Sequence, residues 1–287
     1  MILVDLSQLL VASTFMSMGK EETEVDIKKI RHMILNSLRM YRKKYANEFG
    51  ELVICCDGSL SWRREIFPHY KAGRKTGREQ SPLNWNQIFG CFNQLKQELR
   101  DNFPYQVMEI DTAEADDIIG TLVIRKRKPD ERTMIISSDK DFIQLQREEN
   151  VFQYSPIAKK LLNGIDPHEY LKEHILRGDK SDGIPNVLSN DNCIVDGIRQ
   201  VPLTKKILNE WMNGSIPSTH TLRYERNQEL IDLRYTPWHL QNAILEQYLE
   251  KPKGSRDILP EYFTKNNLTE LTTVSYTHLT LPTIYSV

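Results

Sequence analysis

Four short apolar runs in the first half of the chain end at or near an acidic residue. They are ILVDL, ending around Asp5; LVICCD, ending at Asp57; YQVMEID, leading towards Glu114; and TMIISSD, ending at Asp139. Short apolar runs bounded by polar residues are typical of buried β-strands. The pattern therefore predicts four strands, each followed by an acid.

Between these runs, apolar residues recur with the period of an α-helix. The two stripes are Ile27, Ile30, Ile34, Leu38 and Tyr41, and Ile88, Phe92, Leu95 and Leu99. Strands that alternate with helices indicate βαβ units and a parallel sheet. Because sites in such sheets lie beyond the carboxyl ends of the strands, we expect the acids to share one rim.

The pattern changes at about residue 156. Helical periodicity appears near 166–177, 203–213, 220–232 and 237–249, with loops rich in Gly, Pro and Asn. We therefore expect a core over 1–155 and a smaller helical part over 156–273. The last residues, 274–287, fit neither part, and VSYTHL resembles the translation of a sequencing adaptor, so we predict a non-native tail.

Composition is that of a soluble globular protein, with 39% hydrophobic and 27% charged residues among 287. No apolar run approaches the roughly 20 residues of a membrane span, and no basic leader precedes the first apolar run. The cysteines lack metal-site spacing, which favours a reducing interior. We expect a cytoplasmic protein without a membrane anchor.

Net charge is −1, but the charges are separated along the chain. The segment WRREIFPHYKAGR, from Trp62 to Arg74, is basic and aromatic, and the acids cluster elsewhere. Basic side chains there are candidates for phosphate contacts, and Tyr70 or Trp62 is a candidate for stacking on an unpaired base. A solvated basic loop is the alternative interpretation.

The acids at element ends form a candidate metal site. They are Asp5, Asp57, Glu114, Asp116, Asp139 and Asp141, with Asp179 and Asp182 from the loop GDKSDG. Carboxylates gathered on one rim repel each other without cations, and oxygen-only ligands suit Mg²⁺ or Mn²⁺. The alternative is that each acid is a helix cap or turn residue, as in an Asx turn at SSDKD. Four separate strand ends that each supply an acid favour the metal site.

The stretch AEADDIIG predicts which acids near residue 115 reach that rim. At 100° per residue, Ala115, Ile118, Ile119 and Leu122 form the buried stripe of a helix. Glu114 and Asp116 then flank the stripe. Asp117 is expected to point away from the core and to reach a metal only through water. The alternative for all three acids is that they are there because the helix dipole favours negative charge at a helix N-terminus.

The order of these motifs resembles the structure-specific 5′ nuclease (flap endonuclease) superfamily, in its phage type. Asp5 on the first strand, CDG with WRREIFPHYKAGR, EADD, SSDKDF and GDKSDGIPN follow in the family's order. The resemblance covers residues 1 to about 270. No single motif is specific, but the combined set is.

The resemblance implies an α/β fold: a PIN-like parallel-sheet core followed by a helix–three-turn–helix part. The first six acids would hold one metal ion, and Asp179 and Asp182 would help to place a second. A basic arch at about 60–80 would grip the 5′ strand, with Arg63 and Lys71 serving catalysis. The nucleic-acid contacts implied are Arg63, Arg64, Tyr70, Lys71, Arg74 and Lys180. The segment at 175–206 would hold duplex backbone.

The implied activity is metal-dependent 5′-to-3′ exonuclease and flap endonuclease hydrolysis, with two Mg²⁺ ions that Mn²⁺ can replace. Substrates would be RNA/DNA or DNA/DNA duplexes with 5′ ends or flaps, and the role would be primer removal in phage lagging-strand replication. Single-strand-binding protein and sliding clamp are candidate partners of a monomer. Because VLSNDNCIVDGIRQVP replaces the family's glycine-rich hairpin, a bound potassium ion there is doubtful.

Two other functions fit the same fold. A non-catalytic DNA-structure binder is disfavoured by acids at every expected position. A PIN-type ribonuclease acting on single-stranded RNA is disfavoured by the long basic segment and by GDKSDGIPN. A phosphatase is weaker still, because no D-x-D motif follows the first strand.

Overall fold

The computed structural model describes residues 1–17 and 25–268. The tail predicted at 274–287 lies outside the described residues. Among the described helices, none combines the length and apolar character needed to cross a membrane.

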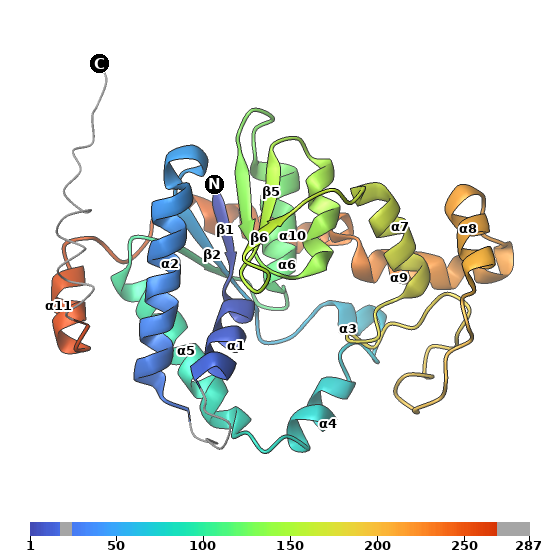
Figure 1. Ribbon diagram of the computed structural model, residues 1–287, viewed down its shortest axis with the longest axis horizontal. Coiled ribbons are helices and arrows are strands. Elements are labelled where there is room, and N and C mark those ends of the chain that lie inside the picture. Colours follow the sequence, from blue (N-terminus) through green and yellow to red (C-terminus); the bar gives the residue numbers. More distant parts are fainter. Residues whose placement is uncertain (18–24, 269–287) are drawn as a thin grey trace.

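A six-stranded sheet with the order β3-β2-β1-β4-β5-β6 forms the centre of the described chain (Figure 1). Its strands are β1 (Ile2–Asp5), β2 (Leu52–Cys56), β3 (Gln106–Glu109), β4 (Thr133–Ile136), β5 (Val151–Ser155) and β6 (Lys160–Leu162). The first five are parallel and β6 is antiparallel to β5. The four predicted strands are confirmed, whereas β5 and β6 were not predicted.

Successive side chains on a strand point to opposite faces of the sheet, so strands that are apolar throughout need cover on both faces. Helices provide this cover. The first face packs on α1 (Leu6–Ser17), α2 (Ile27–Phe49), α5 (Trp85–Asn102) and α11 (Leu259–Lys265). The second face packs on α6 (Ala115–Thr121), a π-helical turn (Leu122–Lys126), a 3-10 helix (Lys140–Arg147) and α10 (Trp238–Leu249). Val4 and Ile54 face the first layer, and Leu3 and Val53 the second. Both predicted apolar stripes lie on confirmed helices, α2 and α5.

The four helices predicted after residue 156 are also confirmed. They are α7 (Pro167–Arg177), α8 (Lys205–Asn213), α9 (Thr221–Ile231) and α10, with short 3-10 turns at Ser218–His220 and Leu233–Tyr235. Three turns, at 180–183, 187–188 and 191–197, lie between α7 and α8. This is the expected helix–three-turn–helix arrangement.

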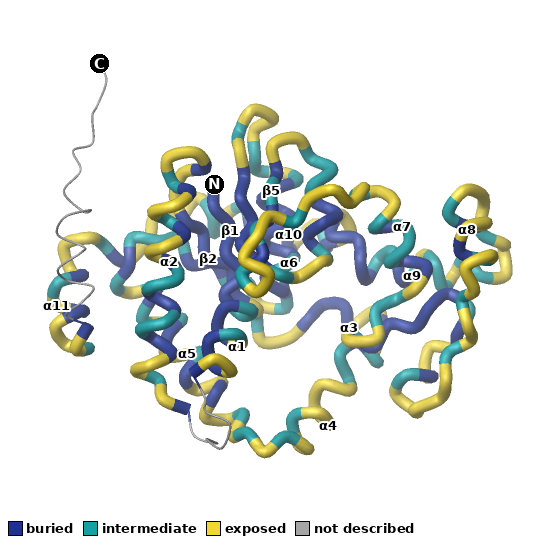
Figure 2. Tube along the Cα trace, in the orientation of Figure 1, coloured by how far each residue is buried: buried dark blue, intermediate teal, exposed yellow. Residues whose placement is uncertain are grey.

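The basic segment forms two short helices, α3 (Arg63–Ile66) and α4 (Gly73–Glu79), which lead away from the sheet towards α5 (Figure 1). None of the residues of α4 is buried, and Figure 2 shows this stretch as mainly exposed. The base of the segment is different, since Phe67 and Tyr70 pack against Leu171 and Ile175 of α7.

The helical part and the sheet share one core. Leu233 and Ile244 belong to the same apolar cluster as Leu3 of β1. The buried side chain of Gln144 bridges the two parts, since its Nε2 donates to the Ile231 carbonyl at 3.1 Å and its Oε1 accepts the Leu233 amide at 2.9 Å.

Replacing Gln144 should therefore weaken the whole fold. Gln144→Leu leaves the Ile231 carbonyl and the Leu233 amide without partners in the interior. We expect the free energy of unfolding to fall by about 2–4 kcal/mol. The control Gln97→Leu alters an exposed helix position and should stay within about 0.5 kcal/mol of wild type. Urea denaturation measures both, and equal midpoints for the two variants would contradict the bridging role.

Candidate metal and nucleic-acid site

The parallel strands place their terminal acids on one rim of the sheet. Asp5 ends β1 and is buried, and it accepts hydrogen bonds from the Gln8 amide and the Ser137 hydroxyl, both at 3.1 Å. Asp57 follows β2, and its Oδ1 accepts the Ala115 amide of α6 at 2.9 Å. The rim of the sheet and the start of α6 are therefore joined directly.

These acids lack counter-charges. Burial and the neighbouring carboxylates of Asp57 and Asp139 raise the pKa of Asp5 to about 7. Burial and the charges of Asp139 and Asp5 raise the pKa of Asp116 well above its ordinary value. Within 1–17 and 25–268, none of these four acids forms an ion pair. An uncompensated cluster of carboxylate oxygens has the donor chemistry that divalent cations such as Mg²⁺ bind.

Asp139 and Asp141 stand at the start of the 3-10 helix after β4. The Oδ1 of Asp139 accepts the Asp141 amide at 2.9 Å. One oxygen of Asp139 therefore caps the helix, as the Asx-turn alternative for SSDKD predicted. Burial raises the pKa of Asp141 to about 7. The charge of His174 opposes this rise, and repulsion from Asp139 and Asp179 adds to it.

The loop GDKSDG brings Asp179 and Asp182 to the same place. The Oδ1 of Asp179 accepts both the amide and the hydroxyl of Ser181 at 2.7 Å. Despite burial, contacts with His174 and Ser181 hold the pKa of Asp179 well below its ordinary range. A narrow cavity beside the rim is lined by Asp116, Asp141, Asp179 and Asp182. A larger hollow of about 440 Å³ lies beside β3 and contains none of the predicted site residues.

The base of the arch contacts two of the acids. The Lys71 ammonium donates to Glu114 Oε1 at 2.6 Å and lies 3.5 Å from Asp182 Oδ2. The Tyr70 hydroxyl has one proton to donate and lies within hydrogen-bond distance of two acceptors, Glu114 Oε2 at 2.7 Å and Asp182 Oδ2 at 3.0 Å. Although burial opposes it, Lys71 and Arg63 hold the pKa of Glu114 below its ordinary value.

Arg63 has a different position from the one predicted. Its side chain is 3% exposed, and its terminal nitrogens donate to both Asp117 oxygens at 2.9 Å. Its Nε donates to the Leu230 carbonyl at 2.7 Å. Because these contacts use its donors in the interior, this arrangement does not offer Arg63 to a 5′ strand, contrary to the prediction.

Burial also contradicts the stacking on an unpaired base that was considered for Tyr70 or Trp62. Trp62 and Tyr70 are 4% and 3% exposed. Arg64, Arg74 and Lys180 are exposed. Contacts of these three with nucleic acid stay predictions.

Asp117 corrects the helix arithmetic. Its side chain is fully buried instead of pointing away from the core. It accepts the Glu114 amide at 2.9 Å, the Trp62 indole at 3.1 Å and the Thr236 hydroxyl at 2.9 Å. The prediction failed because distant parts of the chain cover the outer face of α6. Asp117 therefore caps and anchors the helix.

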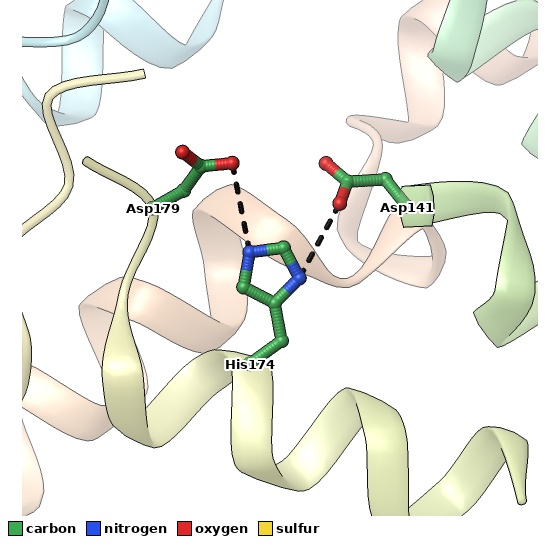
Figure 3. A group of neighbouring side chains, drawn as sticks. All are labelled: Asp141, His174 and Asp179. Carbon is green, nitrogen blue, oxygen red and sulfur yellow. Dashed lines mark ion pairs between the residues drawn. The ribbon is translucent and has the colours of Figure 1, made fainter. Parts of the chain in front are cut away.

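Sequence reasoning missed His174. Among the described residues, the group of metal-binding side chains with ligand atoms all within 4.8 Å of one another is Asp141, His174 and Asp179 (Figure 3). The other predicted carboxylates share the rim without forming so tight a group. A histidine in the last turn of a helix is usually explained by the helix dipole, so EYLKEHIL gave little signal.

Comparisons with known proteins identify the family of the chain. Residues 1–174 match the family model described as 5′-3′ exonuclease, N-terminal resolvase-like domain, and residues 168–276 match the T4 RNase H C-terminal model. The chain belongs to the 5′-3′ exonuclease family.

Relatives within this family include phage and bacterial enzymes. Ribonuclease H of Enterobacteria phage T4 is 32% identical over 94% of this chain and 93% of that protein. Flap endonuclease Xni of Shewanella sp. (strain MR-4) is 30% identical over 47% of this chain and 52% of that protein. The predicted resemblance to phage-type members is confirmed.

A solved structure shares the fold. A flap endonuclease of bacteriophage T5, in a complex with DNA and metal ions, has a TM-score of 0.59 and 16% identity, covering 92% of this chain and 97% of that one. The predicted α/β fold class is therefore confirmed.

Breaking the Arg63–Asp117 pair should destabilise the protein. Arg63→Met leaves the Asp117 charge buried without its partner, and we expect a loss of about 3–5 kcal/mol in unfolding free energy. The neighbouring Arg64→Met removes an exposed charge and should change it by no more than about 0.5 kcal/mol. Urea denaturation compares the two. A small effect of Arg63→Met would show that the pair does not hold the fold.

The metal-free protein should lose stability as pH rises. The folded pKa values of Asp5 and Asp141 are raised from 3.8 to about 7, so the folded state holds these protons more tightly. This stabilisation is complete below about pH 4 and is lost as pH passes through 7. In EDTA, the melting temperature should fall between pH 5 and pH 8. The fall should be smaller with Mg²⁺ and in Asp141→Asn. A melting temperature that rises over this range would contradict the charge repulsion.

Proposed function

We propose that this protein is a divalent-metal-dependent 5′-to-3′ exonuclease and flap endonuclease. Its substrates would be RNA/DNA or DNA/DNA duplexes with 5′ ends or flaps. The observation that carries the proposal is the rim of uncompensated carboxylates at the strand ends, faced by the cationic base of the arch. Membership of the 5′-3′ exonuclease family supports it.

The rim would hold two Mg²⁺ ions, and Mn²⁺ would replace them. Carboxylates nearer the sheet would bind one ion, and those of the GDKSDG loop would bind the second. The first group is Asp5, Asp57, Glu114, Asp116, Asp139 and Asp141; the second is Asp179 and Asp182. Such ions lower the pKa of a water molecule and neutralise charge on the phosphate.

Lys71 would change partners when substrate binds. In this structure its ammonium pairs with Glu114 and Asp182, which also pair with Arg63 and Arg74 respectively. With cations to neutralise those carboxylates, the Lys71 ammonium would be free to bind a phosphate oxygen. Tyr70 would keep Glu114 and Asp182 in place, since its hydroxyl touches both.

The nucleic acid would be held by its backbone. Arg64, Arg74 and Lys180 carry charge at the surface around the arch and the loop, and the helix–three-turn–helix segment would bind duplex phosphates without reading bases. Water would attack the phosphorus in line with the leaving 3′ oxygen. The bond between phosphorus and that oxygen breaks, which leaves a 5′ phosphate on the product.

The biological role proposed is removal of RNA primers and adjacent DNA during phage lagging-strand replication, in the cytoplasm of the infected host. Action as a monomer and recruitment by a single-strand-binding protein or a sliding clamp stay predictions.

A labelled 5′-flap duplex tests the activity. With Mg²⁺, Asp5→Asn and Asp139→Asn should keep DNA affinity and lose cleavage by about 100-fold or more, because each removes a ligand charge worth several kcal/mol to the transition state. The control Asp130→Asn, at an exposed position before β4, should cleave like wild type. Unchanged cleavage by both site variants would refute the site.

The same assay separates the alternatives. EDTA should abolish cleavage, and substrates with RNA or DNA 5′ ends should both be cut. Binding without product from the wild-type protein would favour a non-catalytic DNA-structure binder. A preference for free single-stranded RNA over a flap would favour a PIN-type ribonuclease.

A further inference from the structure

His174 lies between two of the proposed metal ligands. Its Nδ1 is 3.3 Å from Asp141 Oδ1, and its Nε2 is 3.6 Å from Asp179 Oδ2. Figure 3 shows the ring between the two carboxylates, which come from the segment after β4 and from the GDKSDG loop. A single imidazole therefore faces acids from two separate parts of the chain.

Packing fixes the position of the ring. The helix α7 buries Leu171 and Ile175 in the core, which directs His174 towards the rim. One turn earlier, Tyr170 contacts the imidazole edge-on, with ring centroids 5.7 Å apart and planes at 74°. The side chain of His174 is only 14% exposed, so packing restricts its movement at the site.

The hydrogen bonding of the ring is incomplete. Nδ1 is buried and has no hydrogen-bond partner, although Asp141 is close. The contact of Nε2 with Asp179 is longer than a hydrogen bond. A buried polar nitrogen without a partner costs free energy unless something else uses its lone pair or proton.

We propose that His174 is a ligand of the second metal ion, together with Asp179 and with Asp141, which would then serve the second ion as well as the first. The inference rests on the proposed nuclease function, since that function requires metal at this rim. An oxygen-only site is suited to Mg²⁺, whereas an imidazole nitrogen is a good ligand for transition metals. The second site therefore favours Mn²⁺ over Mg²⁺ more strongly than a carboxylate site would.

The competing explanation is that His174 is an imidazolium counter-charge for the two acids and never binds metal. Both explanations place the ring near the carboxylates, so affinity alone does not separate them. Direct coupling between the metal electron spin and the imidazole nitrogen does.

Pulsed electron paramagnetic resonance of Mn²⁺ bound to the wild-type protein, without a polyhistidine tag and without nucleic acid, tests the assignment. We expect ¹⁴N modulation from a coordinated imidazole, which changes to the ¹⁵N pattern when histidine is ¹⁵N-labelled. Bound Mn²⁺ without nitrogen coupling would overturn the proposal. Because this measurement uses the wild-type protein, a folding defect in a variant does not affect it.

Two variants on the same helix locate the nitrogen. His174→Asn should remove the coupling and weaken Mn²⁺ binding at one site by about tenfold or more, measured by calorimetry, with a smaller effect on Mg²⁺. His168→Asn, at an exposed position of α7, is the matched control and should keep both signals. Coupling that survives in His174→Asn would contradict the assignment.

Flap cleavage measured in parallel keeps the two proposals distinct. Cleavage by a protein whose Mn²⁺ shows no nitrogen coupling would refute the role of His174 and leave the nuclease function standing. Nitrogen coupling in a protein that cuts no flap would refute the function and leave the metal ligand standing.

Discussion

The buried ion pair between Arg63 and Asp117 joins the three parts of the protein that meet at the site. Arg63 begins α3 at the base of the arch, and Asp117 lies in the first turn of α6. The same two side chains also contact Leu230 and Thr236 of the C-terminal helical part. A guanidinium and a carboxylate removed from water are tolerated only when their hydrogen bonds are made. The relative positions of the arch, α6 and the helical part are therefore fixed by one network.

That network divides the acids of the rim into two kinds. Glu114 and Asp182 receive positive charge from Lys71 of the arch. Asp5 and Asp116 receive no ion-pair partner among the residues described, and burial with mutual repulsion raises their pKa values. The basic segment of the sequence thus contacts some of the acids in the folded chain. The acids without a positive partner are those nearest the sheet. A cation bound there relieves repulsion that the protein itself leaves in place.

Features set by local pattern could be predicted from the sequence, and those set by distant partners could not. Apolar runs ending in acids predicted the four strands and their common rim, and helical periodicity predicted the main helices. Trp62, Arg63 and Asp117 were misjudged because their partners lie more than 50 positions away. The exposed residues of β6 gave no strand signal. The strand β5 was missed because strands were predicted from apolar runs that end at an acid, and β5 ends at Ser155. His174 was missed because the two acids beside it lie on a loop and after a strand, which meet only in the folded chain.

The base of the arch is anchored independently of the Lys71 ammonium. The main-chain amide of Lys71 donates to the Asp182 carbonyl at 2.7 Å, and its φ of 54° is a left-handed conformation that the surroundings must hold. Across the contact, Gly183 lets the loop approach closely, because a Cβ there would lie 2.8 Å from the His69 carbonyl. Main-chain contacts thus fix the backbone of the arch at this point. The carboxylates of Glu114 and Asp182 position only the Lys71 ammonium. The exchange of Glu114 for another anion that we propose for Lys71 would therefore leave the arch in place at the rim.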